Sequence, residues 1–197
     1  MLTIYFIRHA QPDLTVHEDA IRPLTDKGLQ DRELVTQYLS DKNINAIFSS
    51  PYQRTIETIS HFAEKFKLDI NYVDDFRERK IGCWVEDIDA FYLRQWRDHN
   101  FKLENGESLI EAQSRVIHAL EKILKQFNNH NLVISTHGFV LSALINYYDS
   151  LFGIDDFLQI VKIMPFVSKF SFENNKCVEI NSLNLFNHEN LYHWRVR

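Results

Sequence analysis

Cysteine and long hydrophobic runs are both scarce in this sequence. Only two of its 197 residues are cysteines, Cys83 and Cys177. They lie far apart and form no CxxC pattern, which favours a reduced cytoplasmic pair over a disulfide. The apolar opening at residues 1–7 ends at Arg8 and His9, so it is too short for a signal-peptide core, and no stretch reaches membrane-spanning length. We therefore expect a cytoplasmic protein with no membrane contact.

Positive charge is also in short supply. The formal net charge is -5 and the sequence pI is near 6.0. This balance argues against a general nucleic-acid or membrane-surface binder, because such proteins bind polyanions. It leaves room for a local phosphate site. With 45% hydrophobic residues, the chain suits one globular domain over residues 1–197.

Short β-rich runs alternate with stretches of helical periodicity. The expected strands span 2–7, 46–48, 68–73 and 131–135, and the expected helices span 25–39, 51–66, 108–127 and 138–148. This order predicts an α/β fold, a three-layer sandwich with a mostly parallel central sheet and helices on both faces. The tail at 157–186 is expected to add one or two strands. The irregular, aromatic-rich stretch 74–106 is expected to form a small cap insertion over one end of the sheet.

Two helix starts carry capping signals. Thr25 is the predicted N-cap of the first helix. Ser50 and Pro51 predict the start of the second, with a capping hydroxyl followed by proline at the first helical position. Apolar residues three and four apart predict that Leu29 and Phe66 turn toward the core.

Three predicted strands end in residues that suit anion chemistry. The first strand leads into Arg8 and His9, the second leads to Arg54, and the fourth leads to His137 and Gly138. Ligands of open α/β sheets collect beyond the carboxyl ends of the strands. Helix N-termini there add free N–H groups and the positive end of a dipole. The spacing therefore predicts an anion site at this edge.

The combination of these residues carries more information than any one of them. Taken alone, Arg54 is more typical of a surface arginine and His137 of a histidine at a helix cap. Two arginines and two histidines at one edge would repel each other and lose solvation without an anion. A tetrahedral dianion resolves both problems, because guanidinium groups match phosphate oxygens in pairs.

The sequence resembles the histidine phosphatase superfamily, the phosphoglycerate-mutase-like proteins. Six stretches carry the resemblance in the family's order: Tyr5–Ala10, Arg22–Gly28, Ile47–Thr55, Glu78–Trp84, Gly106–Ser108 and Val133–Gly138. The resemblance implies a metal-independent enzyme without a cofactor. It implies a small phosphomonoester as substrate, a phosphohistidine intermediate and inorganic phosphate as product.

The resemblance also assigns roles to single residues. His9 matches the phosphorylated histidine, while Arg8, Arg54 and His137 match the clamp around the phosphoryl group. Glu78 matches the carboxyl proton donor; from spacing alone, Glu86 is a second candidate. Gly138 opens the helix at the clamp, and Gln11 and Arg22 are weaker candidates for binding the substrate.

Two departures from the family pattern bear on activity. Ala10 stands where the family usually has glycine, which matters if the backbone there needs a positive φ. The loop at residues 11–15 lacks the acidic-Ser/Thr-x-Trp-Asn run of the mutases. Together with the short chain, this loop favours a phosphatase over a mutase. A non-catalytic phosphate-binding or scaffold protein is the third alternative, and the retention of Arg8, His9, Arg54, Glu78 and His137 together argues against it.

Overall fold

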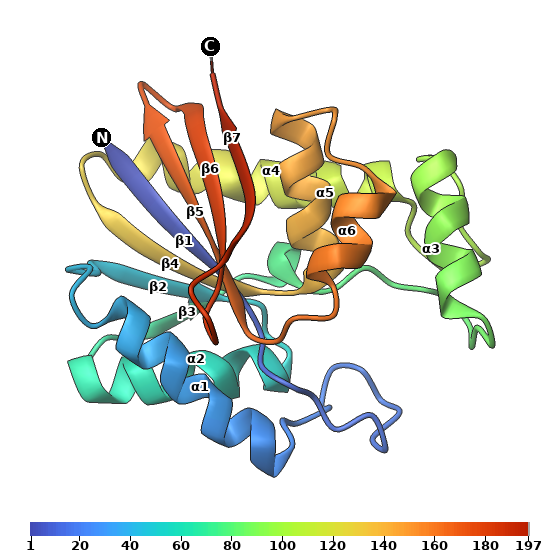
Figure 1. Cartoon of the computed structure of the whole chain (residues 1–197), viewed down its shortest axis with the longest axis horizontal. Coiled ribbons are helices and arrows are strands. Elements are labelled where there is room, and N and C mark those ends of the chain that lie inside the picture. The colour runs from blue at the N-terminus through green and yellow to red at the C-terminus, as the bar shows by residue number, and fades with distance from the viewer. Residues whose placement is uncertain (197) are drawn as a thin grey trace.

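A seven-stranded sheet runs through the centre of the computed structural model, which describes residues 1–196 (Figure 1). The strands are β1 Leu2–Arg8, β2 Ala46–Ser49, β3 Ile70–Tyr72, β4 Asn131–Thr136, β5 Phe166–Glu173, β6 Lys176–Asn184 and β7 Asn190–Arg195. Their order is β3-β2-β4-β1-β5-β6-β7. Pairing is parallel from β3 to β1 and antiparallel from β1 to β7. The predicted α/β fold is confirmed, with a sheet that is mixed.

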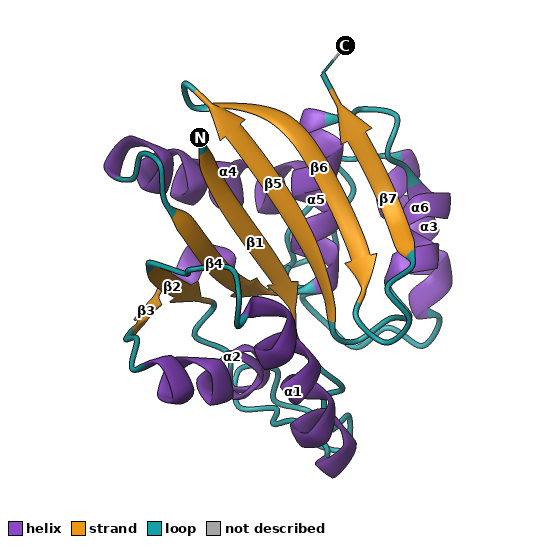
Figure 2. Cartoon of the chain, turned by 60° about the vertical axis from the view of Figure 1, so that its left-hand side comes forward, coloured by secondary structure: helices purple, strands orange, loops and turns teal. Residues whose placement is uncertain are grey.

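Helices cover both faces of the sheet (Figure 2). The helices are α1 Asp26–Leu39, α2 Gln53–Phe66, α3 Ile88–Arg97, α4 Leu109–Gln126, α5 Gly138–Tyr148 and α6 Ile154–Ile160, with a 3-10 turn, η1, at Asp74–Phe76. One apolar cluster joins α1 and α2 to one face, and a larger cluster joins α4, α5 and α6 to the other. These are the three layers that the sequence predicts.

The side chains of β1 alternate between the two faces of the sheet, so this one strand contributes to both apolar clusters. Ile4 and Phe6 point into the larger cluster, whereas Tyr5 and Ile7 point into the smaller one. Successive side chains of a strand point to opposite faces, so a central strand that is covered twice must be apolar throughout. Full burial of each such side chain stabilises the fold by about 1.5–3 kcal/mol.

The capping predictions meet different outcomes. Thr25 is the N-cap of α1, and its hydroxyl accepts a hydrogen bond from the Gly28 N–H at 3.0 Å. The second helix begins at Gln53, two residues after Pro51, so the predicted start is wrong. The Ser50 hydroxyl lies 2.8 Å from the His137 ring and accepts only a 3.2 Å bond from the Tyr52 N–H. His137 therefore contacts the hydroxyl that was expected to cap the helix.

Two predicted core residues lie at the surface. Leu29 is 37% exposed and Phe66 is 39% exposed, both near helix ends. Val35 and Leu39 fill the inner face of α1 instead, and Phe62 fills that of α2.

The tail at residues 157–186 contains two strands, β5 and β6, within the one or two expected. Phe157, at its start, is buried in the short helix α6. A further strand, β7, follows the predicted tail. It is an edge strand with half-exposed residues, so it shows little alternation of polar and apolar side chains.

The segment 74–106 contains η1 and α3, joined by loops. Trp96 packs against Phe139 and Phe157 of the larger cluster, whereas Trp84 is 78% exposed. No helix within residues 1–196 is both long and apolar enough to cross a membrane.

Candidate active site

The backbone of the sheet brings the predicted cationic residues to one edge. The His9 N–H donates to the Thr136 carbonyl at 3.1 Å, which ties the end of β1 to the end of β4. The Ser50 N–H donates to the Ser135 carbonyl at 2.9 Å, which ties the end of β2 to β4 as well. The chain segments after β1, β2 and β4 therefore leave the sheet side by side.

The contacts of His9 define which ring nitrogen carries the proton. Its Nδ1 lies 2.7 Å from the Ala10 carbonyl, which can only accept, so Nδ1 is protonated. The Arg54 Nε–H, which can only donate, lies 3.2 Å from His9 Nε2. Both contacts require the same tautomer, with the lone pair on Nε2. The ring is buried, with 5% exposure.

Arg54 lies in the first turn of α2 and is 3% exposed. Besides His9, its guanidinium group contacts Asp19: Nη1 lies 2.6 Å from the backbone carbonyl and 3.1 Å from the carboxylate. The ring of Tyr52 lies 5.2 Å beneath the guanidinium carbon. The arginine is held on three sides with its Nε directed at the histidine.

Arg8 is anchored by backbone carbonyls around the end of α6. Its Nη1 donates to the carbonyls of Ile160, Val161 and Ile163, at the end of α6 and just after it. Its Nε is buried and has no hydrogen-bond partner among residues 1–196. A Cβ added to Gly138 would lie 2.9 Å from that Nε. Glycine at the start of α5 therefore lets the guanidinium group pass close to the helix N-terminus.

His137 precedes α5 and is fully buried. Its ring centroid lies 5.3 Å from that of His9 and 5.3 Å from that of Tyr52. Nε2 contacts the Ser50 hydroxyl, whereas the buried Nδ1 has no partner within the described residues. The structure thus brings Arg8, His9, Arg54, His137 and Gly138 together, and we call this group the cradle.

Burial and mutual repulsion keep the cradle histidines neutral. Burial lowers the pKa of His9 well below its ordinary value, and the charges of Arg54, Arg8 and the more distant Arg22 lower it further. Burial, Arg54 and His9 likewise lower the pKa of His137. Burial also lowers the pKa of Arg8 to about 10, although Glu78 and Tyr92 favour its charged form. The cradle concentrates positive charge that an anion would stabilise.

Glu78 lies beside the cradle, at the N-terminus of α5. One carboxylate oxygen accepts from the Arg79 N–H at 2.8 Å, and the other accepts from the Phe139 N–H at 3.3 Å. The side chain is half-buried. The alternative acid, Glu86, is exposed.

The weaker candidates are engaged elsewhere. The Gln11 side chain accepts from the Thr25 hydroxyl at 3.1 Å, at the start of α1. Arg22 donates to the Val16 carbonyl at 2.7 Å and to the Asp19 carboxylate at 2.8 Å. Asp19 thus bridges Arg22 and Arg54, a role that sequence reasoning missed because no pattern marks the residue.

Ala10 does not have a positive φ. Its N–H donates to the Thr58 hydroxyl at 2.9 Å, and its side chain is fully buried. Alanine therefore fits where the family usually has glycine, without strain in the backbone.

Within residues 1–196, no group of three or more His, Cys, Asp and Glu side chains could hold a metal ion. Cys83 is exposed and Cys177 is buried, and both are free thiols.

A family model, the histidine phosphatase superfamily (branch 1), matches residues 4–178. The chain belongs to this family. The match confirms the family predicted from the six motifs, and with it the class of enzyme, a histidine phosphatase that hydrolyses phosphomonoesters.

Similar proteins include a phosphatase and a probable mutase. Phosphoserine phosphatase 1 of Hydrogenobacter thermophilus is 29% identical over 79% of this chain and 78% of its own length. A probable phosphoglycerate mutase, GpmB of Serratia proteamaculans, is 28% identical over 74% of each chain. The structure of YhfR from Bacillus stearothermophilus superposes with a TM-score of 0.76 at 22% identity, covering 90% of this chain and 94% of that one.

Proposed function

We propose that His9 is the nucleophile of a phosphomonoester hydrolase that acts on small phosphorylated metabolites. The observation that carries this proposal is the tautomer of His9. Its Nε2 carries the lone pair, accepts a hydrogen bond from the Arg54 Nε–H and belongs to a ring whose pKa is lowered by burial and by the charges of Arg54, Arg8 and Arg22. A neutral imidazole among buried cations suits in-line attack on the phosphorus of a bound dianion.

In the first step, the phosphate enters the cradle and Arg54 transfers its donors from His9 to phosphate oxygens. The lone pair of His9 Nε2 forms a bond to phosphorus while the ester P–O bond breaks. Glu78 gives its proton to the departing alkoxide oxygen. Arg8, Arg54 and His137 stabilise the charge that the transition state spreads over the equatorial oxygens.

In the second step, the Glu78 carboxylate takes a proton from water. The water oxygen bonds to phosphorus as the P–N bond to His9 breaks, and inorganic phosphate leaves. Glu78 is again protonated and His9 is again neutral. Neither step needs a metal or an organic cofactor, because the cradle supplies the positive charge.

Hydrolysis is favoured over transfer to a second hydroxyl because the loop at residues 11–15 lacks the run typical of mutases. We assign the segment 74–106 as the cap that delivers Glu78 and borders the leaving group. We also propose that the enzyme acts in the cytoplasm and has no nucleic-acid or membrane partner.

Hydrolysis of phosphomonoesters in the presence of a metal chelator tests the proposal. Purified protein with excess EDTA is expected to release phosphate from p-nitrophenyl phosphate and from members of a phosphorylated-metabolite panel. Addition of 3-phosphoglycerate with its bisphosphate is expected to give free phosphate without an isomeric monophosphate. Transfer to the isomer would favour the mutase, and the absence of any turnover on the panel would favour a binding protein.

A further inference from the structure

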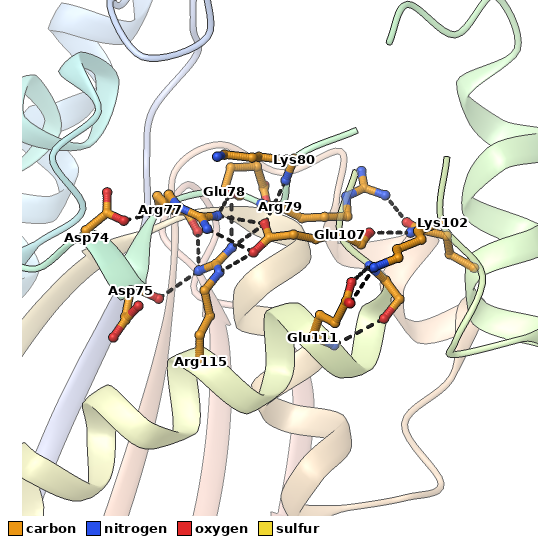
Figure 3. Close-up of polar contacts among 12 residues, drawn as sticks. Asp74, Asp75, Arg77, Glu78, Arg79, Lys80, Lys102, Glu107, Glu111 and Arg115 are labelled. Carbon is orange, nitrogen blue, oxygen red and sulfur yellow. Dashed lines mark hydrogen bonds and ion pairs between the residues drawn. The ribbon is translucent and has the colours of Figure 1, made fainter. Parts of the chain in front are cut away.

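The segment that carries Glu78 is contacted at several backbone carbonyls by Arg115, a partly buried arginine of α4. Residues 77–80 follow η1 and belong to no helix or strand. Arg115 donates to two carbonyls of this segment, that of Arg77 at 3.0 Å and that of Glu78 itself at 3.2 Å, and to the Asp75 carbonyl of η1 at 2.7 Å. A single guanidinium group thereby fixes the path of the backbone on both sides of Arg77 (Figure 3).

Glu107 orients that arginine. Its carboxylate accepts from Arg115 Nε at 2.8 Å and Nη2 at 3.1 Å, and from Arg77 Nη1 at 2.6 Å and Nη2 at 2.9 Å. It also accepts from the Lys80 N–H at 2.9 Å, while its own N–H donates to the Lys80 carbonyl at 2.8 Å. The three charged side chains are between 11% and 15% exposed. Figure 3 shows the carboxylate between the two guanidinium groups.

The carboxylate of Glu107 is held in its ionised form. Burial favours its neutral form, but the hydrogen bonds from Arg115, Arg77 and the Lys80 N–H outweigh burial and hold the pKa of Glu107 well below its ordinary range. Glu107 therefore stays ionised across the pH range in which an enzyme is assayed. It is a fixed anchor that does not exchange protons.

Glu78 depends on this anchor because its own side chain has weak support. Among residues 1–196, its carboxylate accepts from two backbone N–H groups, one of them at 3.3 Å. Both the Cα position of Glu78 and the position of the Arg79 N–H follow from where the backbone of residues 77–80 runs. Misplacement of a reacting group by about 1 Å can cost roughly a hundredfold in rate.

We propose that Arg115, oriented by Glu107, is a positioning residue for the proton donor Glu78. It touches neither the substrate nor the reacting atoms, and it acts by fixing the backbone from which the Glu78 carboxyl reaches the leaving-group oxygen. The inference rests on the proposed role of Glu78 as general acid. It adds that this role requires Arg115, which lies on α4, a helix that carries no cradle residue.

The test compares substrates whose leaving groups differ in their need for a proton. The value of kcat/KM reports steps only as far as the first irreversible one, which is formation of the phosphoenzyme. Arg115→Lys keeps the charge but cannot donate to three carbonyls and one carboxylate at once. For a simple alkyl phosphate we expect kcat/KM to fall by roughly tenfold to a hundredfold. The p-nitrophenolate group leaves without protonation, so for p-nitrophenyl phosphate we expect a change of less than about threefold.

Glu78→Gln and the double variant separate the two proposals. If Glu78→Gln shows no dependence on the leaving group, the role of Glu78 as acid fails. If it does and Arg115→Lys does not, only the positioning proposal fails. If Arg115 acts through Glu78, adding Arg115→Lys to Glu78→Gln should lower kcat/KM by less than about twofold more. Equal losses on both substrates, or additive losses in the double variant, would overturn the proposal.

Two further variants guard the interpretation. Lys102→Met removes an exposed ion pair with Glu111, at the start of the same helix and away from residues 75–80. It is expected to leave both substrates unaffected. If Arg115→Lys does not fold, Glu107→Gln takes its place, because it removes the anchor but leaves the arginine, and the same selective loss is expected.

Discussion

The cradle and the segment that carries Glu78 are built in different ways. Arg8, His9 and His137 lie at the ends of β1 and β4, and Arg54 lies in the first turn of α2. Regular backbone hydrogen bonds fix those positions. Glu78 follows a 3-10 turn, in a stretch whose path depends on Arg115 and Glu107. The cradle is part of the sheet architecture, whereas the proton donor is attached to it by side chains.

This contrast separates two kinds of sensitivity. Changes in the cradle should slow every substrate, because all substrates share the phosphoryl group. Changes around Glu78 should slow substrates in proportion to their need for a proton. Substitutions of Arg54, Glu78 and Gly138 test that distinction, in order of decreasing effect, and the stability of the cradle against pH gives the smallest effect.

Arg54→Met should cause the largest loss. The variant removes donors to the phosphoryl oxygens, and kcat/KM should fall by roughly a hundredfold to a thousandfold. Alkyl phosphates and p-nitrophenyl phosphate should be affected alike in steady-state assays. Arg32→Met is the matched control, since Arg32 bonds the Glu57 carbonyl of the same helix from outside the site. A loss confined to poor leaving groups would mean that Arg54 acts on the acid and not on the phosphoryl group.

Glu78→Gln should come next, with a loss of about a hundredfold or more on alkyl phosphates. The amide keeps the size of the side chain but cannot supply the proton. The measurement is a plot of log kcat/KM against the pKa of the leaving group, which should become steeper than for the wild type. An unchanged slope would transfer the role to another acid, with Glu86 as the next candidate to replace.

Gly138→Ala should have an intermediate effect on all substrates. The new Cβ would lie 2.9 Å from Arg8 Nε and 3.1 Å from its Cζ, so the guanidinium group has to move away from α5. We expect kcat/KM to fall by roughly tenfold. Gly153→Ala is the control, because its Cβ would meet nothing closer than 3.9 Å. Equal activity of the two variants would show that Arg8 does not need its present position.

The smallest effect concerns stability. The pKa values of His9 and His137 are lowered in the folded protein, so below about pH 6.5 the unfolded chain binds protons that the folded chain does not. Their contribution is fully present above that pH and is lost as the pH falls through it toward the folded pKa values. Each histidine contributes a slope of at most about 1.4 kcal/mol per pH unit.

Urea unfolding of the ligand-free protein between pH 8 and 5.5 measures this slope. The free energy of unfolding should decline below about pH 6.5, and His137→Asn should make the decline shallower. An identical slope in the variant would contradict the burial of a neutral His137.

The contrast between the two regions also explains what the sequence could predict. The strand ends that deliver Arg8, His9, Arg54 and His137 are visible because short apolar runs stop at polar or charged residues. The predicted start of α2 was wrong because the Ser50 hydroxyl contacts a histidine 87 residues away. Local capping rules cannot include such a partner.

The long-range side-chain contacts were out of reach for the same reason. Glu107 belonged to a recognised motif, but nothing near Arg115 indicates that it bonds to carbonyls 37 to 40 residues earlier. Asp19 contacts Arg54 across 35 residues. The edge strand β7 was missed because its half-exposed residues show little alternation.

The most direct test of the account is to trap the phosphorylated enzyme. Protein mixed with a radiolabelled phosphomonoester and quenched within milliseconds should carry a phosphoryl group that is stable to alkali and labile to acid. Peptide mapping should locate it on Nε2 of His9, and His9→Ala should carry no label and show no turnover. Label on another residue, or turnover by His9→Ala at the wild-type rate, would contradict it.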